Sequence, residues 1–329
     1  MSTITEMSCG VPQGSVLGPK QFIAYTEDLV DIFSKHEVSH HGYADDSQGF
    51  AESKPHEVRS IVSSLQATVS DVSSWCSSRR LQLNEHKTEV IWFGTSANLS
   101  RLSPADTKLH LDGAIIDPTN VVRDLGVFFD SELSMRDHIS RITRSCFFQL
   151  RRIRPIHRQL GRVVTQRLVA AFVMSRIDYC NAVLAELPTT TLAPLQRVQN
   201  AAARLVLNLK RSDHITPALI ELHWLPVKFR IIFKLCLLVH KSQNGLAPNY
   251  LTELFQPISG LSSRTALRSA STHALEIPAT RLNFGNRAFS VAGAKHWNTL
   301  PEQLRALTDT PTFKRQLKTH LFRTAFNLI

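Results

Sequence analysis

The chain has 329 residues, 43% hydrophobic and 20% charged, with a net charge of +11, and this composition is typical of a folded globular protein. It contains neither an apolar run long enough to cross a membrane nor a secretory signal pattern, so an intracellular protein, nuclear or cytoplasmic, is expected. The five cysteines are scattered without a CxxC pair, which argues against a zinc knuckle and for free thiols.

A glycine-rich segment opens the predicted fold. The sequence SCGVPQGSVLGP at residues 8–19 spaces Gly10, Gly14 and Gly18 four residues apart. Glycine allows another molecule to approach the backbone closely, although a plain turn-rich loop is the other interpretation of such a cluster. Apolar residues at helical spacing then predict a helix over residues 20–34.

The next predicted element is a hairpin whose tip carries two adjacent carboxylates. A strand ending at Tyr43, a tight turn over residues 44–46 and a strand ending at Phe50 are expected, without an Asn-Gly turn signal. Asp45 and Asp46 would repel each other unless water solvates both or a cation lies between them. Mg²⁺ is commonly held by one or two carboxylates plus substrate phosphates, so a magnesium site is one interpretation and a solvated surface turn is the other.

The remainder of the acidic first part predicts one long helix and two strands. An apolar face from Val58 to Cys76 is typical of an amphipathic helix. Strands are expected at Val90–Phe93 and Leu125–Phe129. Together with the hairpin these elements predict an α+β layer, a small antiparallel sheet backed by helices.

Charge separates the second part of the chain from the first. Residues 1–130 carry 10 basic and 17 acidic side chains, net −7, whereas residues 131–329 carry 28 and 10, net +18. An amphipathic helix is predicted over residues 139–153, and its outer face carries Arg141, Arg144, Arg151 and Arg152. Residues 136–176 hold ten arginines and one acid, so contact with nucleic acid is predicted, with a solvated helix face as the alternative.

The rest of the second part is also predicted to be mainly helical. Helices are expected around residues 162–186, 192–209 and 227–242, with breaks at Pro188, Pro194, Pro217 and Pro226. A Ser/Thr-rich linker or loose loop follows, and then a basic amphipathic helix with Phe313, Leu317, Leu321 and Phe322. Trp224 and Trp297 could stack on bases, but their spacing favours a role as core anchors.

Four segments in this order resemble a known family. GVPQGSVLGP, YADD, LNEHKTE and LGVFFDSELSMRDHI are similar to the palm of reverse transcriptases of non-LTR retrotransposons (LINE elements), in particular jockey-like lineages. The later segments SRIDYCNAVL, LQRVQNAAARL and FKRQLKTHLF resemble the region that follows the polymerase core. The resemblance implies an RNA-directed DNA polymerase that uses Mg²⁺ or Mn²⁺, an RNA template, a DNA primer and deoxynucleoside triphosphates.

The resemblance also implies domains and residue roles. The domains would be a partial palm (1–130), a basic helical thumb-like region (131–256), a linker or loose loop (257–285) and a basic helical tail (286–329). Asp45 would be a catalytic metal ligand with Asp46 beside it, and the Arg-rich helix would grip the template–primer backbone. The other implied site residues are Tyr43 and Ala44 at the primer end and nucleotide, Gln13 and Gly14 at the template, and Lys87 near the leaving pyrophosphate. Tyr43 as a packing residue and Lys87 as an ordinary exposed lysine are the alternatives.

One expected part of the polymerase is missing from the sequence given. Polymerases of this kind use a third carboxylate from a strand before the GVPQG segment, and the nine residues before Gly10 include no aspartate. The resemblance therefore implies an N-terminally truncated palm and thumb without fingers, which is not expected to polymerise alone. A non-catalytic RNA- or DNA-binding remnant is the alternative function. No feature of the sequence indicates an oligomeric state.

Overall fold

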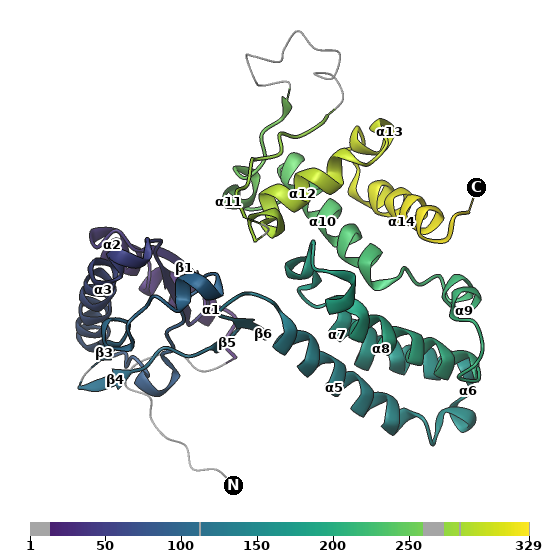
Figure 1. Ribbon diagram of the computed structural model, residues 1–329, viewed down its shortest axis with the longest axis horizontal. Coiled ribbons are helices and arrows are strands. Elements are labelled where there is room, and N and C mark those ends of the chain that lie inside the picture. Colours follow the sequence, from purple (N-terminus) through teal and green to yellow (C-terminus); the bar gives the residue numbers. More distant parts are fainter. Residues whose placement is uncertain (1–13, 112, 259–272, 283, 329) are drawn as a thin grey trace. The chain divides into compact units, whose positions relative to one another are not determined.

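The computed structural model describes residues 14–111, 113–258, 273–282 and 284–328, which form two compact units, Met1–Leu133 and Ser134–Ile329 (Figure 1). The predicted loop residues Gly10 and Gln13 lie outside the described residues. Within the described part of the chain, no helix combines the length and the apolar character needed to cross a membrane.

The first unit is α+β, as predicted. Its helices and 3₁₀ turns are α1 (Gly18–Tyr25), α2 (Leu29–Lys35), η1 (Pro55–Glu57), α3 (Val58–Ser78), η2 (Glu85–Lys87), α4 (Ser96–Leu99) and η3 (Pro104–Asp106). Its strands are β1 (Ser39–Tyr43), β2 (Asp46–Phe50), β3 (Leu109–Leu111), β4 (Ala114–Ile116), β5 (Val121–Asp124) and β6 (Val127–Asp130). The strands pair as three separate antiparallel hairpins, β1–β2, β3–β4 and β5–β6, rather than as one small sheet.

Three predicted elements of the first unit are corrected by the structure. The helix over residues 20–34 is interrupted after Tyr25, where the Thr26 hydroxyl donates to the carbonyl of Phe22 and competes with the helical backbone pattern. Residues 90–93 form no strand, because they make isolated backbone hydrogen bonds and no continuous ladder of strand hydrogen bonds. One such bond runs from the Thr119 N–H to the Val90 carbonyl (2.8 Å). Leu125 begins a turn and not a strand.

Helix α3 organises the core of the first unit, as its apolar face predicts. On one side Val72 and Cys76 pack with Leu29, Phe33 and Val38 from α2 and the start of the β1–β2 hairpin. Leu65 also contacts a second cluster formed by Leu109, Leu111 and Ile116 of β3 and β4. Gln66 fixes this hairpin to α3, because its side chain bonds both the N–H (2.6 Å) and the carbonyl (2.5 Å) of His110. The start of the β1–β2 hairpin therefore packs, through Val38, against the core formed by α2 and α3.

The second unit is mainly helical, and its described residues also include loops and one isolated antiparallel bridge between Pro257 and Leu275. Its longer helices are α5 (Arg136–Ile153), α6 (His157–Val169), α8 (Thr189–Leu207), α10 (Val227–Gln243), α12 (Phe289–Asn298) and α14 (Thr310–Phe326). The shorter elements are the π-helical turn η4 (Ala170–Met174), α7 (Ser175–Asp178), η5 (Asn181–Leu184), α9 (Ile215–Glu221), α11 (Asn249–Thr252), η8 (Gly285–Arg287) and α13 (Glu302–Arg305).

Two predictions about this unit need correction. The single helix expected over residues 162–186 is divided among α6, η4, α7 and η5. Pro188 and Pro226 do precede helices, but Pro194 lies inside α8 and Pro217 in the first turn of α9. Pro217 is tolerated because the first N–H groups of a helix have no intrahelical acceptor, whereas Pro194 lies further inside α8 and removes one bond of its helical pattern. Part of the predicted linker, residues 259–272, lies outside the described residues.

One large hydrophobic core of the second unit joins α10, α12 and α14. Phe313 and Trp297 are almost completely buried there, and Trp224 is also buried, which confirms the predicted anchoring role of the two tryptophans. His240 stacks on Phe313 with ring centroids 4.1 Å apart and lies 3.1 Å from the Thr310 hydroxyl. Burial lowers the pKa of His240, so the imidazole is neutral near pH 7.

The described cysteines are free thiols, distributed over both units. Cys76, Cys146 and Cys236 are buried and Cys180 is exposed. Burial raises the pKa of Cys146 to about 11 and that of Cys236 to about 12. The free-thiol prediction therefore holds for the described residues, and Cys9 lies outside them.

Candidate functional site

The YADD segment forms the tip of the β1–β2 hairpin, as predicted. The register pairs Tyr43 with Asp46, so the turn consists of Ala44 and Asp45 and is one residue shorter than expected. Ala44 has a φ of 55°, a conformation in which glycine is usually favoured. All four side chains are exposed, and Tyr43 retains 62% of its accessible surface. The tip therefore presents its carboxylates to solvent, where another molecule can reach them.

A second hairpin supplies a carboxylate to the same neighbourhood. Asp124 ends β5, and the turn that follows is formed by Leu125 (φ 43°) and Gly126 (φ 83°). Gln48 lies two residues after Asp46 on β2, and its Nε2 donates to Asp124 Oδ1 at 2.5 Å. Burial raises the pKa of Asp124 and the negative charge of Asp46 raises it further, whereas His41 lowers it. The two hairpins therefore share one electrostatic environment.

Sequence reasoning did not include Asp124 or Gln48 among the candidate site residues. Asp124 precedes a predicted strand by one residue, and it is 76 positions away from Gln48 along the chain. A signal was present in the Asp-Leu-Gly run at residues 124–126, since Asp and Gly are common turn residues. It was obscured because leucine, an unusual residue at positive φ, occupies the first turn position.

We expect Gln48→Leu to destabilise the first unit by about 1 kcal/mol. The substitution removes a hydrogen bond to a partly buried carboxylate while keeping a side chain of similar size. Urea unfolding of the variant and the unaltered protein measures this difference. Gln21→Leu is the matched control, because Gln21 is exposed on α1 and makes no side-chain hydrogen bond within the described residues. Equal effects of the two substitutions would contradict a stabilising role for the Gln48–Asp124 contact.

The structure does not join the other predicted site residues to the hairpin tip. Lys87 is exposed at the end of η2, and Gly14 is exposed with a φ of 87°. Within the described residues, no hydrogen bond or ion pair connects either of them to Asp45. Gln13 lies outside the described residues.

The donor set at the tip fits a cation that is shared with a ligand. Asp45 and Asp46 offer carboxylate oxygens, which Mg²⁺ prefers, and both are exposed. Among the residues that the structure describes, no group of three or more His, Cys, Asp or Glu side chains is arranged to hold a metal. The tip therefore suits one or two carboxylate ligands completed by phosphates and water, and does not suit a self-contained metal cage.

The predicted arginine face is present on α5. Arg141, Arg144, Arg151 and Arg152 are all exposed and lie along one stripe of the helix, and Phe148 (51% exposed) lies in the same stripe. The Arg152 guanidinium lies over the Phe148 ring, 5.7 Å from its centroid. No carboxylate of the described chain forms an ion pair with Arg144, Arg151 or Arg152. This face can therefore accept phosphates from outside the protein.

Comparison with known proteins agrees with these features. Residues 3–126 match the sequence profile of the family described as reverse transcriptase (RNA-dependent DNA polymerase). These residues are therefore similar to reverse transcriptases. This segment contains both the YADD hairpin and Asp124, whereas α5 lies beyond it. The predicted resemblance to the family is confirmed.

Individual relatives of this chain are polymerases of mobile elements. The chain is 29% identical over 157 residues to the probable RNA-directed DNA polymerase from transposon BS of Drosophila melanogaster, covering 45% of this chain and 16% of that protein. It is 28% identical over 149 residues to the RNA-directed DNA polymerases from the mobile element jockey of Drosophila melanogaster and of Drosophila funebris, covering 44% of this chain and 15% of each. The chain thus spans about one sixth of the length of these relatives. No solved structure matches it.

Proposed function

We propose that this chain is the palm-and-thumb portion of an RNA-directed DNA polymerase of a non-LTR retrotransposon. The observation that carries the proposal is the exposed pair Asp45–Asp46 at a hairpin tip inside the residues that match the reverse transcriptase family. In this proposal residues 1–130 are a partial palm, 131–256 a thumb, 257–285 a linker and 286–329 a basic tail. The reaction adds a deoxynucleoside triphosphate to a DNA primer on an RNA template.

The carboxylates are proposed to bind the metal jointly with the nucleotide. Asp45 and Asp46 would hold Mg²⁺ or Mn²⁺ together with phosphate oxygens. When bound, the metal would supply charge stabilisation for the attacking and leaving oxygens. Gln48 and Asp124 would act as positioning residues, because their contact holds the strand that follows the turn. An exposed tip that requires the phosphates to complete its ligand set would bind the metal weakly in the absence of nucleotide.

The remaining candidate residues would contact the polynucleotide and the nucleotide. Tyr43 and Ala44 flank the carboxylates and would touch the primer end. Gly14 has no side chain to obstruct a template strand, and Gln13 would lie beside it. Lys87 would neutralise the leaving pyrophosphate. These roles follow from the family resemblance and from the exposure of the described members.

A second candidate function is non-catalytic binding of RNA or DNA. It is favoured by the +18 charge of residues 131–329 and by the lack of a three-ligand metal cluster among the described residues. In this function the arginine face binds phosphates, and the YADD hairpin keeps the fold of a polymerase site without a catalytic role. Binding would depend strongly on salt under both functions, so a salt titration does not distinguish them.

Primer extension with an Asp45→Asn/Asp46→Asn variant distinguishes the two functions. The assay uses folded protein, an RNA template with a DNA primer, deoxynucleoside triphosphates and Mg²⁺ or Mn²⁺. Synthesis that requires metal and falls at least about a hundredfold in the double variant supports the polymerase, since even outer-shell partners of metal ligands typically contribute about 10–100-fold. Glu52→Gln, which removes an exposed carboxylate just after the hairpin, should retain full activity.

Binding of the same template–primer gives the complementary result. The double variant is expected to bind as well as the unaltered protein or slightly more tightly, because two negative charges that repel phosphates are gone. A folded protein that binds template–primer but extends it with neither metal would overturn the polymerase proposal in favour of non-catalytic binding.

A further inference from the structure

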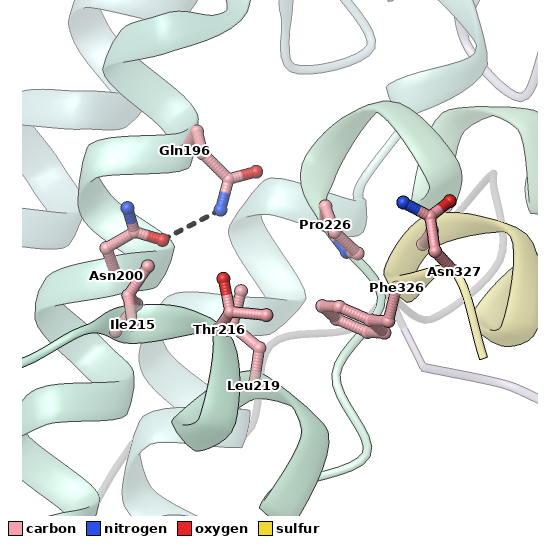
Figure 2. A pocket seen from close by; sticks show the side chains of 9 residues that line it. Gln196, Asn200, Ile215, Thr216, Leu219, Pro226, Phe326 and Asn327 are labelled. Atoms are coloured by element: carbon pink, nitrogen blue, oxygen red, sulfur yellow. Dashed lines mark hydrogen bonds between the residues drawn. The ribbon is translucent and has the colours of Figure 1, made fainter.

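A cavity in the second unit differs in its chemistry from the YADD hairpin of the first unit. Its volume is about 450 Å³, and its lining comes from α8, α9, the start of α10 and the end of α14 (Figure 2). The lining residues are Gln196, Asn200, Ile215, Thr216, Leu219, Pro226, Ala325, Phe326 and Asn327. None of them is ionisable. The cavity therefore suits neither a phosphate nor a metal ion, although it lies in a region of net charge +18.

The amide wall of this cavity is held in place by hydrogen bonds. Gln196 donates from Nε2 to Gln199 Oε1 (2.9 Å) and to Asn200 Oδ1 (2.8 Å), and its Oε1 accepts from the N–H of Val227 (2.9 Å). Gln199 is completely buried and donates to the Leu225 carbonyl at 2.8 Å. Gln196 thus has both donors occupied, and it orients the Asn200 amide. The wall is fixed before any ligand arrives.

Other polar groups around the cavity remain available. The Thr216 hydroxyl points from α9 toward the Gln196–Asn200 pair (Figure 2). Within the described residues, neither this hydroxyl nor the Asn327 side chain forms a hydrogen bond, and the Asn200 oxygen has one lone pair left. Together they offer both donors and acceptors. A ligand with a polar edge could use them.

A flat apolar surface completes the cavity. The Phe326 ring projects from the end of α14 beside Pro226, and Leu219 lies below Thr216 (Figure 2). Phe326 is held edge-to-face against Phe322, with ring centroids 4.8 Å apart. Because Phe326 lines the cavity, a planar ligand can stack on its ring there. The occupant should therefore be planar and uncharged, with hydrogen-bonding groups on its rim.

We propose that this cavity binds one unpaired nucleobase, stacked on Phe326 and hydrogen-bonded to Thr216 and to the amides of Asn200 and Asn327. A nucleobase combines a π-face with a rim of donors and acceptors, and base–aromatic stacking is a common mode of single-strand binding. The +18 region around it would attract the polyanion to which the base belongs. The proposal rests on the proposed function only for the presence of a nucleic acid. A peptide segment is the competing occupant.

Free nucleosides test the cavity without any phosphate contact. Adenosine, guanosine, cytidine and uridine are titrated into the full chain while the side-chain amide NMR signals of Asn200 and Asn327 are followed. At least one nucleoside is expected to shift both signals, and Thr216→Val should abolish the shift. Unchanged signals with all four nucleosides would overturn the proposal. So would shifts caused by a blocked dipeptide amide while the nucleosides cause none.

Single-stranded oligonucleotides that contain 2-aminopurine test the stacking. Phe326→Leu is expected to weaken their affinity about tenfold and to remove the quenching of the base, whereas Phe326→Tyr should retain both. Phe172→Leu is the matched control, since it removes an exposed phenylalanine elsewhere in the same unit. Equal losses in Phe326→Leu and Phe172→Leu would count against the site.

The two proposals can fail independently. A variant with Arg144, Arg151 and Arg152 replaced by glutamine should lose oligonucleotide binding and keep the nucleoside shifts. A protein that binds no template–primer but still responds to nucleosides would refute the proposed function and leave the cavity proposal intact. A protein that binds template–primer but gives no nucleoside response would refute the cavity proposal and leave the proposed function intact.

Discussion

Replacing Arg144, Arg151 and Arg152 by glutamine is expected to weaken template–primer binding by about a hundredfold at low salt. The three guanidinium groups lie on one exposed stripe of α5 and form no ion pair with a described carboxylate. If each phosphate contact contributes about 1 kcal/mol, three contacts amount to about two orders of magnitude. The slope of log affinity against log salt should also fall by about 3. Fluorescence anisotropy of a labelled duplex at several salt concentrations measures both quantities.

The location of these charges, and not only their number, decides the outcome. Replacing Lys314, Arg315 and Lys318 by glutamine removes the same charge from an exposed face of α14 in the same unit. This control should weaken binding by no more than about threefold, because it lowers only the long-range electrostatic attraction between the protein and the nucleic acid. If both triple variants lose affinity equally, α5 is not the contact surface and only the net charge attracts the nucleic acid.

Phe313→Ala is expected to reduce the free energy of unfolding of the second unit by about 3–5 kcal/mol. Phe313 is fully buried, stacks on His240 and lies 5.7 Å, centroid to centroid, from the Trp297 ring. Truncation would leave a cavity between three helices, and large-to-small changes of this kind have costs in that range. Urea unfolding followed by tryptophan fluorescence reports the loss, because Trp297 belongs to the same cluster.

The exposed Phe148 provides the matched comparison. Phe148→Ala removes the same number of atoms from the surface of α5, where the ring contacts the Arg152 guanidinium. Its effect on the free energy of unfolding should stay within about 0.5 kcal/mol. A loss above about 2 kcal/mol for Phe148→Ala, or below that for Phe313→Ala, would contradict the expected contribution of Phe313 to the core of α10, α12 and α14.

Elements with long, regular apolar patterns were predictable from the sequence. The apolar face that begins at Val58 predicted α3, and the spacing of Phe313, Leu317 and Leu321 predicted α14. Shorter elements were not predictable in the same way. Residues 121–130 form a hairpin because Leu125 takes a positive φ, and a leucine does not signal a turn. The division of residues 162–186 into four elements depends on tertiary packing, which periodicity does not report.

The candidate site was predictable where its residues are adjacent in sequence. Asp45 and Asp46 neighbour each other, so a short hairpin was enough to place them together. The Gln48–Asp124 contact joins residues 76 positions apart, and no local pattern indicates which two hairpins approach each other. The same holds for the cavity that Phe326 lines, because its wall joins the consecutive helices α8, α9 and α10 to the end of α14, much further along the chain.

The rate at which the buried cysteines are alkylated reports local opening of the folded chain. Thiolate is the reactive form, so a thiol that is both buried and raised in pKa reacts only when its surroundings open. In a Cys9→Ser background, Cys180 would react first and set the reference rate. Alkylation of Cys76 would then time fluctuations of α3, and alkylation of Cys236 those of α10. Peptide mass mapping over a single time course measures the alkylation rate of each cysteine. These rates rank the regions of both units by how often they open locally.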